Sequence, residues 1–189
     1  MCFYITSTLP KKVKLEDLEE VFKKYNMAFK SIKNISIQDQ LRPEELYFRA
    51  TNAYCDCNTI LGALNTSEEY KKLLDSEKIR SLKKKKWTSE QIDIWIREKI
   101  KGKNPKFEKL TEIEKENEIK RWKDFIQEIL ASKKVKRIGI LKHWYNSSLS
   151  EEKFKIRESK QIQIDQLNKN LLLNLEEDIL YEFIPIYKY

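Results

Sequence analysis

The side chains best suited to chemistry in this 189-residue sequence are three cysteines, Cys2, Cys55 and Cys57, and the single histidine, His143. Zinc prefers thiolate and imidazole ligands in a tetrahedral arrangement, so these four side chains form one candidate site, with the Asp56 carboxylate as another fourth ligand. Alternate residues of an extended chain point to opposite faces, so Cys55 and Cys57 converge only if a turn bends the chain between them. A zinc site is one hypothesis. The alternative is that the thiols pack as small apolar groups.

Cys2 also has a catalytic interpretation. An initiator methionine is normally removed when the second residue is small, which would leave the Cys2 thiol beside a free α-amine. Such an amine, with a reference pKa of about 7.7–8.0, can accept the thiol proton without a histidine. The Asn58 amide or backbone N–H groups of the 57–62 turn are candidate oxyanion donors, and Arg49 is a candidate clamp for a substrate carboxylate. These residues predict an N-terminal-nucleophile amide hydrolase with Cys2 as the nucleophile.

Two short strings of the sequence resemble the same known enzyme family. Met1-Cys2 and Arg49-Ala50-Thr51 are similar to class II glutamine amidotransferases, which open with Met-Cys and carry Arg-Trp-Ala-Thr. The tryptophan is missing here, and Phe3 replaces the glycine that follows the cysteine in that family. This resemblance implies a nucleophile at Cys2, and the layered α/β/β/α build of N-terminal-nucleophile hydrolases is the fold expected with it.

The sequence also resembles an uncharacterised bacterial family with an M-C-x-Y opening, a C-D-C-G-T-x-L-G turn and a late H-W-Y string. The corresponding residues here are 1–4, 55–62 and 143–145, with Asn58 in place of the glycine. The resemblance covers both ends of the chain and leaves its middle third uncovered. It implies a shared fold and a shared cysteine site, and it implies no particular activity.

Composition excludes several classes of protein. Three glycines and no G-x-G or G-K-[ST] string exclude a phosphate-cradling loop of the dinucleotide-binding or P-loop type. No apolar run approaches the roughly 20 residues that span a membrane, and the N-terminus lacks a signal-peptide pattern. An odd number of cysteines without such a signal is typical of reduced, intracellular proteins. The expectation is a cytoplasmic protein that does not engage a membrane.

The charge of the chain is unevenly distributed. Residues 78–137 contain 20 basic and 10 acidic side chains, whereas residues 1–77 and 138–189 each have a net charge of −1. The densest positive run is Lys83-Lys84-Lys85-Lys86, followed directly by Trp87, a combination that suits phosphate backbones and unpaired bases. The alternative function is therefore a non-enzymatic binding or inhibitor protein, such as one encoded by a mobile element, whose basic segment engages nucleic acid or a nucleoprotein. Solvated lysines of a lysine-rich chain explain the same run without any partner.

Hydrophobic periodicity indicates the elements that carry these groups. Strands are expected at 2–9, 46–51, 135–145 and 179–187, with shorter extended segments at 28–32, 35–37, 154–157 and 162–164. Helices are expected at 15–25, 67–86, 92–100 and 106–131, with a short one at 165–173, and Thr88 with Gln91 forms a candidate capping box. The predicted fold class is α+β: a mixed or antiparallel sheet domain of residues 1–66 and 134–189, with a basic helical insertion at 67–133.

Overall fold

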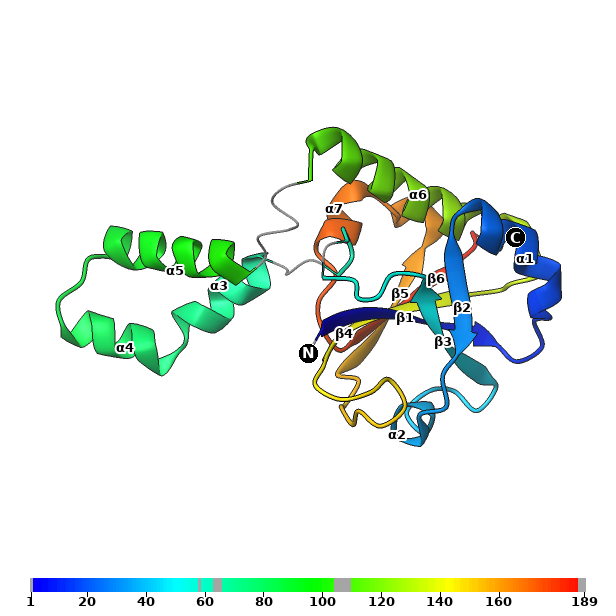
Figure 1. Cartoon of the computed structure of the whole chain (residues 1–189), viewed down its shortest axis with the longest axis horizontal. Coiled ribbons are helices and arrows are strands. Elements are labelled where there is room, and N and C mark those ends of the chain that lie inside the picture. The colour runs from blue at the N-terminus through cyan, green and yellow to red at the C-terminus, as the bar shows by residue number, and fades with distance from the viewer. Residues whose placement is uncertain (1, 58, 63–65, 104–109, 187–189) are drawn as a thin grey trace.

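The computed structural model describes residues 2–57, 59–62, 66–103 and 110–186. Its centre is a six-stranded mixed sheet in the order β2-β3-β1-β4-β6-β5 (Figure 1). Neighbouring strands are antiparallel except β5 and β6, which are parallel. The predicted α+β class is confirmed. The strands are β1 Cys2–Pro10, β2 Met27–Ser31, β3 Glu45–Thr51, β4 Ile138–Tyr145, β5 Glu158–Gln163 and β6 Ile179–Ile184.

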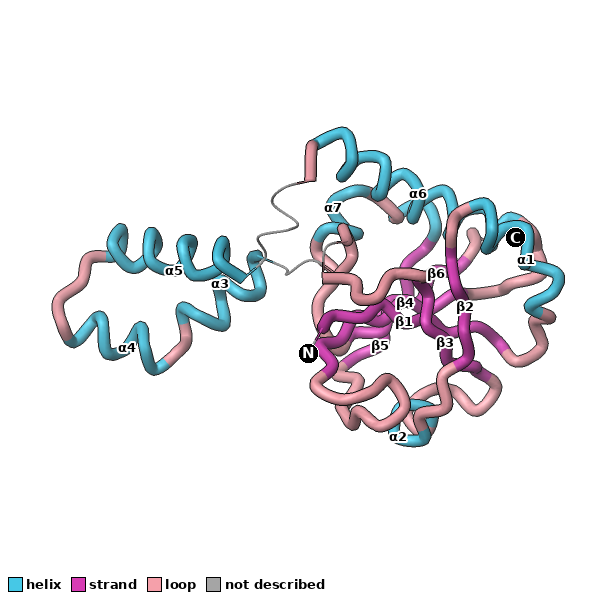
Figure 2. Tube along the Cα trace, in the orientation of Figure 1, coloured by secondary structure: helices cyan, strands magenta, loops and turns pink. Residues whose placement is uncertain are grey.

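Helices cover one face of this sheet and form the larger core with it. The 3-10 turn Leu15–Leu18 leads into α1 (Glu19–Lys24), and α6 (Glu112–Ala131) and α7 (Lys169–Leu173) lie on the same face (Figures 1 and 2). Side chains at every third or fourth position of α6 meet the alternate inward residues of the strands. The buried residues that α6 contributes are Ile119, Trp122, Phe125, Ile126, Ile129 and Leu130.

This packing corrects the expected boundary of the insertion. The predicted insertion of 67–133 includes α6, yet the apolar stripe of α6 is buried against the sheet. The helices outside the sheet core are α3 (Thr66–Leu74), α4 (Glu77–Lys84) and α5 (Ser89–Lys103), which extend as an arm in Figure 1. Their own small core consists of Ile79, Leu82, Ile92, Ile96 and Ile100. We call residues 66–103 the helical arm.

The arm also differs from the single helix expected over 67–86. Ser76 ends that run, because its side chain accepts a hydrogen bond from the Ile79 N–H and starts a separate helix, α4. The predicted capping box at the start of α5 is confirmed by reciprocal hydrogen bonds between Thr88 and Gln91. None of the helices in the described ranges combines the length and apolar character needed to cross a membrane.

The opposite face of the sheet is covered by α2 (Ile35–Gln38) and by the loop that follows β4. The alternation Ile35-Ser36-Ile37 predicts an extended segment, but it forms a turn of helix because the Asn34 side chain caps the Ile37 N–H. Residues 154–157 are likewise a loop, and they place Phe154 and Ile156 against Leu141 and Leu180. The described residues form one sheet, so the two stacked sheets of an α/β/β/α sandwich are not present in them.

Candidate functional site

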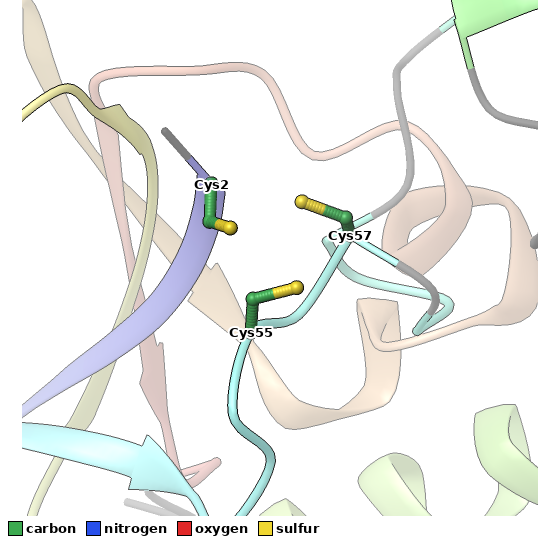
Figure 3. Close-up of side chains that lie close together, drawn as sticks. All are labelled: Cys2, Cys55 and Cys57. Atoms are coloured by element: carbon green, nitrogen blue, oxygen red, sulfur yellow. The ribbon is translucent and has the colours of Figure 1, made fainter.

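The three cysteines come together at the end of the sheet. Cys2 is the first residue of β1, and Cys55 and Cys57 lie in the loop that follows β3. Their Sγ atoms all lie within 4.8 Å of one another, and each residue is half-buried. Figure 3 shows the three sulfur atoms pointing into one shared space. The required turn between Cys55 and Cys57 is present, so the thiols face each other instead of opposite sides of a strand.

Backbone hydrogen bonds hold this turn against β1. The Asp56 N–H donates to the Phe3 carbonyl over 2.9 Å, and the Phe3 N–H donates to the Cys57 sulfur over 3.2 Å. The Ile5 N–H donates to the Asp56 carboxylate over 2.7 Å. The turn therefore satisfies the backbone groups of β1 beyond the point where pairing with β3 stops, which is at Thr6 and Arg49.

Asp56 is the centre of the turn and is fully buried. Its carboxylate also accepts a hydrogen bond from the Thr51 hydroxyl and pairs with the Arg49 guanidinium, each at 2.7–2.8 Å. Burial raises the pKa of Asp56, while Arg49 and the hydrogen bonds act in the opposite direction. A buried carboxylate with this many partners anchors the loop in one conformation.

Arg49 therefore has a different role from the one expected. Its guanidinium pairs with Asp56, donates to the Ala53 carbonyl over 3.0 Å and lies 4.2 Å from the centre of the Tyr4 ring. These contacts orient the loop that carries the cysteines. A substrate carboxylate would have to compete with Asp56 for the same charge, so Arg49 is a positioning residue for the turn.

Residues 59–62, which follow Cys57 with one residue between, stabilise the turn with further hydrogen bonds. The Thr59 N–H and hydroxyl both donate to the Asp56 carbonyl at 2.8 Å, and the Gly62 N–H donates to the Thr59 hydroxyl. A Cβ at Gly62 would lie 2.1 Å from the Asp56 carbonyl oxygen, so only glycine fits there. The Glu118 carboxylate of α6 accepts from the Ile60 N–H. Asn58, the predicted oxyanion donor, lies outside the described residues.

The thiols differ in acidity. Burial raises the pKa of Cys57 to about 12, and it also raises the pKa of Cys2, with the neighbouring Cys55 adding to that increase. The pKa of Cys55 is lowered, since hydrogen bonds from the Cys57 backbone and from the other two thiols outweigh its own burial. Ionisation of the Cys55 thiol is therefore favoured over ionisation of the Cys2 and Cys57 thiols.

His143 is not part of this cluster. Among the described residues, the cluster of ligand atoms around Cys2 contains cysteines alone. The His143 Nδ1 lies 2.6 Å from an Asp178 carboxylate oxygen, and its ring stacks on Phe154 with centroids 3.5 Å apart. His143 pairs across the sheet with Tyr4, two residues from Cys2 along β1. The ligand set that included His143 is thus reduced to three cysteines.

The predicted nucleic-acid-binding residues lie in the helical arm. Lys83, Lys84, Lys85 and Lys86 are exposed at the end of α4, and Trp87 is 38% exposed in the turn before α5. The positive φ of Lys86, 62°, turns the chain back so that the Trp87 N–H donates to the Leu82 carbonyl. The four lysines and Trp87 thus lie exposed to solvent at the end of α4 and in the turn that joins it to α5. They are more than 25 residues along the chain from the last cysteine.

Comparison with protein-family models, with curated proteins and with solved structures finds no match for this chain. The structure changes the expected role of Asp56 from a metal ligand to the anchor of the turn, because its carboxylate is bound by Ile5, Thr51 and Arg49. It adds two groups that the sequence patterns did not indicate: Glu118 as the contact of the turn to α6, and Thr59 as its internal brace. The signal for the anchoring role of Asp56 was its place between two cysteines, five residues after Thr51 of the Arg49-Ala50-Thr51 string, which supplies two of its partners.

Proposed function

We propose that Cys2, Cys55 and Cys57 form a binding site for a thiophilic divalent metal ion, with zinc as the physiological candidate. The observation that carries this proposal is the approach of all three Sγ atoms to within 4.8 Å of one another. In a tetrahedral site with Zn–S distances of about 2.3 Å, sulfur atoms are separated by about 3.8 Å. The three side chains need to move only slightly to reach that geometry.

Electrostatics also supports a metal ion at this position. Burial disfavours the thiolate forms of Cys57 and Cys2, which is the main reason that the pKa of Cys57 rises to about 12 and that the pKa of Cys2 also rises. Negative charge on a neighbouring thiol adds to both increases. A divalent cation removes this penalty by replacing the thiol protons. The bound metal would join the first residue of β1 to the Cys55–Cys57 turn and so fasten the end of the sheet.

Three protein ligands leave the fourth position of a tetrahedral metal open. Sites of this kind hold a water or an exogenous ligand, whereas purely structural zinc sites usually have four protein ligands. If Met1 is removed, the α-amine of Cys2 is a fourth ligand within reach, because it belongs to the same residue as one of the thiols. Without that amine, the proposed site has an open position that can accept a water or a further group; with it, the site has four protein ligands.

The test is metal analysis of protein purified anaerobically, with and without added Zn²⁺. We expect one zinc per chain, and a Co²⁺-substituted form with the intense visible absorption of tetrahedral thiolate coordination. Cys57→Ser is expected to weaken zinc binding by at least about tenfold. The matched control is His143→Gln, which is expected to retain full stoichiometry because His143 lies outside the cluster.

The proposal fails if wild-type protein that retains its thiols binds no zinc or cobalt at neutral pH. It also fails if Cys57→Ser binds zinc as tightly as the wild type, or if His143→Gln alone loses the metal. The last result would indicate a different ligand set.

A second candidate function is amide hydrolysis by Cys2. It is supported by the position of Cys2 at the first residue of β1, where its side chain is half-buried and so retains some exposure to solvent. The raised pKa of the Cys2 thiol argues against it at neutral pH, unless the neighbouring α-amine accepts the proton. Mass spectrometry of the native protein decides the first step, since retention of Met1 contradicts this mechanism.

A further inference from the structure

A groove of about 480 Å³ lies on the face of the sheet that carries α2, between the end of β2 and the loop after β4. Its volume is within the range of small-molecule sites, roughly 300–1,000 Å³. Its lining combines three cationic side chains, four serines and one tyrosine, and none of its described lining residues is acidic. The polar and cationic lining residues are Tyr4, Lys30, Ser31, Lys33, Arg49, Ser147, Ser148 and Ser150.

The cations are brought together by the register of the sheet. Lys30 on β2 is directly opposite Arg49 on β3, and cross-strand partners project from the same face. Like charges in this position repel each other. Asp56 neutralises Arg49 from the side of the cysteine turn, but neither Lys30 nor Lys33 forms an ion pair with any described residue. The groove therefore has two positive charges without a counter-ion from this part of the chain.

The opposite wall is a fixed feature of the fold. The buried Asn34 amide donates to the Leu149 and Glu152 carbonyls at 3.0 and 2.8 Å. These bonds hold the loop after β4, which carries Ser147, Ser148 and Ser150 and which we call the serine loop, beside β2. The Glu152 carboxylate in turn accepts from the Ser147 N–H and hydroxyl. These hydrogen bonds fix the position of the loop after β4 relative to Asn34, and so they determine the width of the groove between that loop and β2.

The end of β2 that borders this groove is irregular. A bulge lies between Met27 and Lys30, and Phe29 within it has a positive φ of 42°. A phenylalanine in this region of φ/ψ space is strained, and its ring is held by stacking on Phe22 with centroids 4.4 Å apart. The bulge sets the direction in which Lys30 and the following residues leave the sheet.

We propose that this groove binds a small molecule with two or more anionic oxygens of the phosphate class, held by the ammonium groups of Lys30 and Lys33. Lysine ammonium groups bind phosphate as point charges, and the small serine side chains leave room for the ligand. This site is distinct from the metal site, because its contacts to the anion are the lysine ammonium groups and it needs no thiol.

The test is calorimetric titration of the full chain with inorganic pyrophosphate at low ionic strength, with orthophosphate and sulfate in parallel. We expect pyrophosphate to bind with one site per chain, more tightly than either single anion. Lys30→Gln/Lys33→Gln is expected to raise the dissociation constant by about tenfold or more. The matched control is Lys84→Gln/Lys85→Gln in the helical arm, which is expected to change it by less than about twofold.

Three results would overturn the proposal: no measurable pyrophosphate binding by the wild type, equal binding by the groove variant, or an equal or larger loss in the arm variant. The last would show that the lysine run in the arm attracts the anion. All four substituted lysines are exposed, so both variants are expected to fold, and an unchanged unfolding temperature verifies this. Zinc stoichiometry measured on the same samples separates failure of the groove from failure of the metal site.

Discussion

At the scale of single residues, Asp56 determines the arrangement of the cysteines. It lies between Cys55 and Cys57 in sequence, is fully buried, and connects β1, the end of β3 and the Arg49 guanidinium. A buried ion pair contributes little net stability, but removing one partner leaves an uncompensated charge in a site of low polarity. The thiol geometry therefore depends on a residue that supplies no sulfur.

Asp56→Asn keeps the size of the side chain and removes its charge. We expect a loss of about 3–5 kcal/mol in the free energy of unfolding, because the buried Arg49 cation loses its partner. Urea denaturation monitored by tryptophan fluorescence measures this. Asp93→Asn, which affects an ion pair with Arg97 on the surface of α5, is the matched control and is expected to have a much smaller effect. Equal effects of the two substitutions would contradict the anchoring role of Asp56.

The pKa values of the thiols predict how metal binding depends on pH. Cys57, with a pKa of about 12, and Cys2, with a raised pKa, both hold protons at neutral pH, and a metal ion must displace them. Zinc affinity is therefore expected to rise with pH, by about a hundredfold per unit if two protons are released. Competition titrations with a chelator between pH 6 and 8 measure the slope. An affinity independent of pH would contradict binding by protonated thiols.

At the scale of elements, two groups of helices have separate cores. The stripe of α6 is buried against the sheet, whereas α4 and α5 contribute four buried isoleucines to a separate cluster, against which Tyr70 and Leu73 of α3 pack. Both groups look alike in sequence, with isoleucines at helical spacing among many lysines and glutamates. Only the partner surface distinguishes a helix of the sheet domain from a helix of the arm, and periodicity contains no information about that partner.

Ile96→Ala and Ile129→Ala test this separation with the same substitution at two fully buried positions. Each deletion is expected to cost about 2–5 kcal/mol in the core that contains it. Ile96→Ala should increase amide hydrogen exchange in α4 and α5 by at least about thirtyfold and leave the strands unchanged. Ile129→Ala should destabilise the sheet itself. Increased exchange of β1 and β4 in Ile96→Ala would mean that the arm and the sheet unfold as one unit.

At the scale of the whole molecule, positive charge is concentrated on both sides of α6 along the chain and not in α6 itself. The helical arm, residues 66–103, has a net charge of +5, α6 has −2, and residues 132–137 have +4. Part of the last group is neutralised, because Arg137 pairs with Glu44, Glu45 and Glu182. The arm is thus the basic part of the molecule, and the sheet domain holds the thiol cluster and the anion groove.

If the arm engages nucleic acid, binding must depend on its charge and on salt. Lys84→Glu/Lys85→Glu is expected to weaken binding of single-stranded DNA by about tenfold or more at 0.1 M salt and to flatten the salt dependence. Lys11→Glu/Lys12→Glu makes the same change on the exposed surface of the sheet domain and is the matched control. Fluorescence anisotropy at several salt concentrations measures both. Equal binding by the wild type and the arm variant would exclude this role.

The local signals in the sequence determined much of the secondary structure. Strands at the start, near 46–51, within 135–145 and near the end follow from runs of β-branched and aromatic residues, and the start of α5 follows from the capping group Thr88. The start of α6 was expected at residue 106, whereas the helix begins at Glu112 after the cap Thr111. The same local rules misplaced residues 35–37, where the cap from Asn34 outweighed the alternation of isoleucines. They also predicted one helix where Ser76 starts a second.

The candidate site was decided only in part by the sequence. The residue types of Cys2, Cys55 and Cys57 identified the chemistry, and their convergence depended on a turn that the sequence alone left open. In the tertiary structure Asp56 anchors that turn and Arg49 pairs with Asp56. The His143 ring lies outside the cysteine cluster and contacts the Asp178 carboxylate. The tertiary structure also brought Lys30, Lys33 and the serine loop to one groove across more than 100 residues. The physical reason is that hydrogen-bond partners and burial are set by segments distant in sequence, which local patterns do not encode.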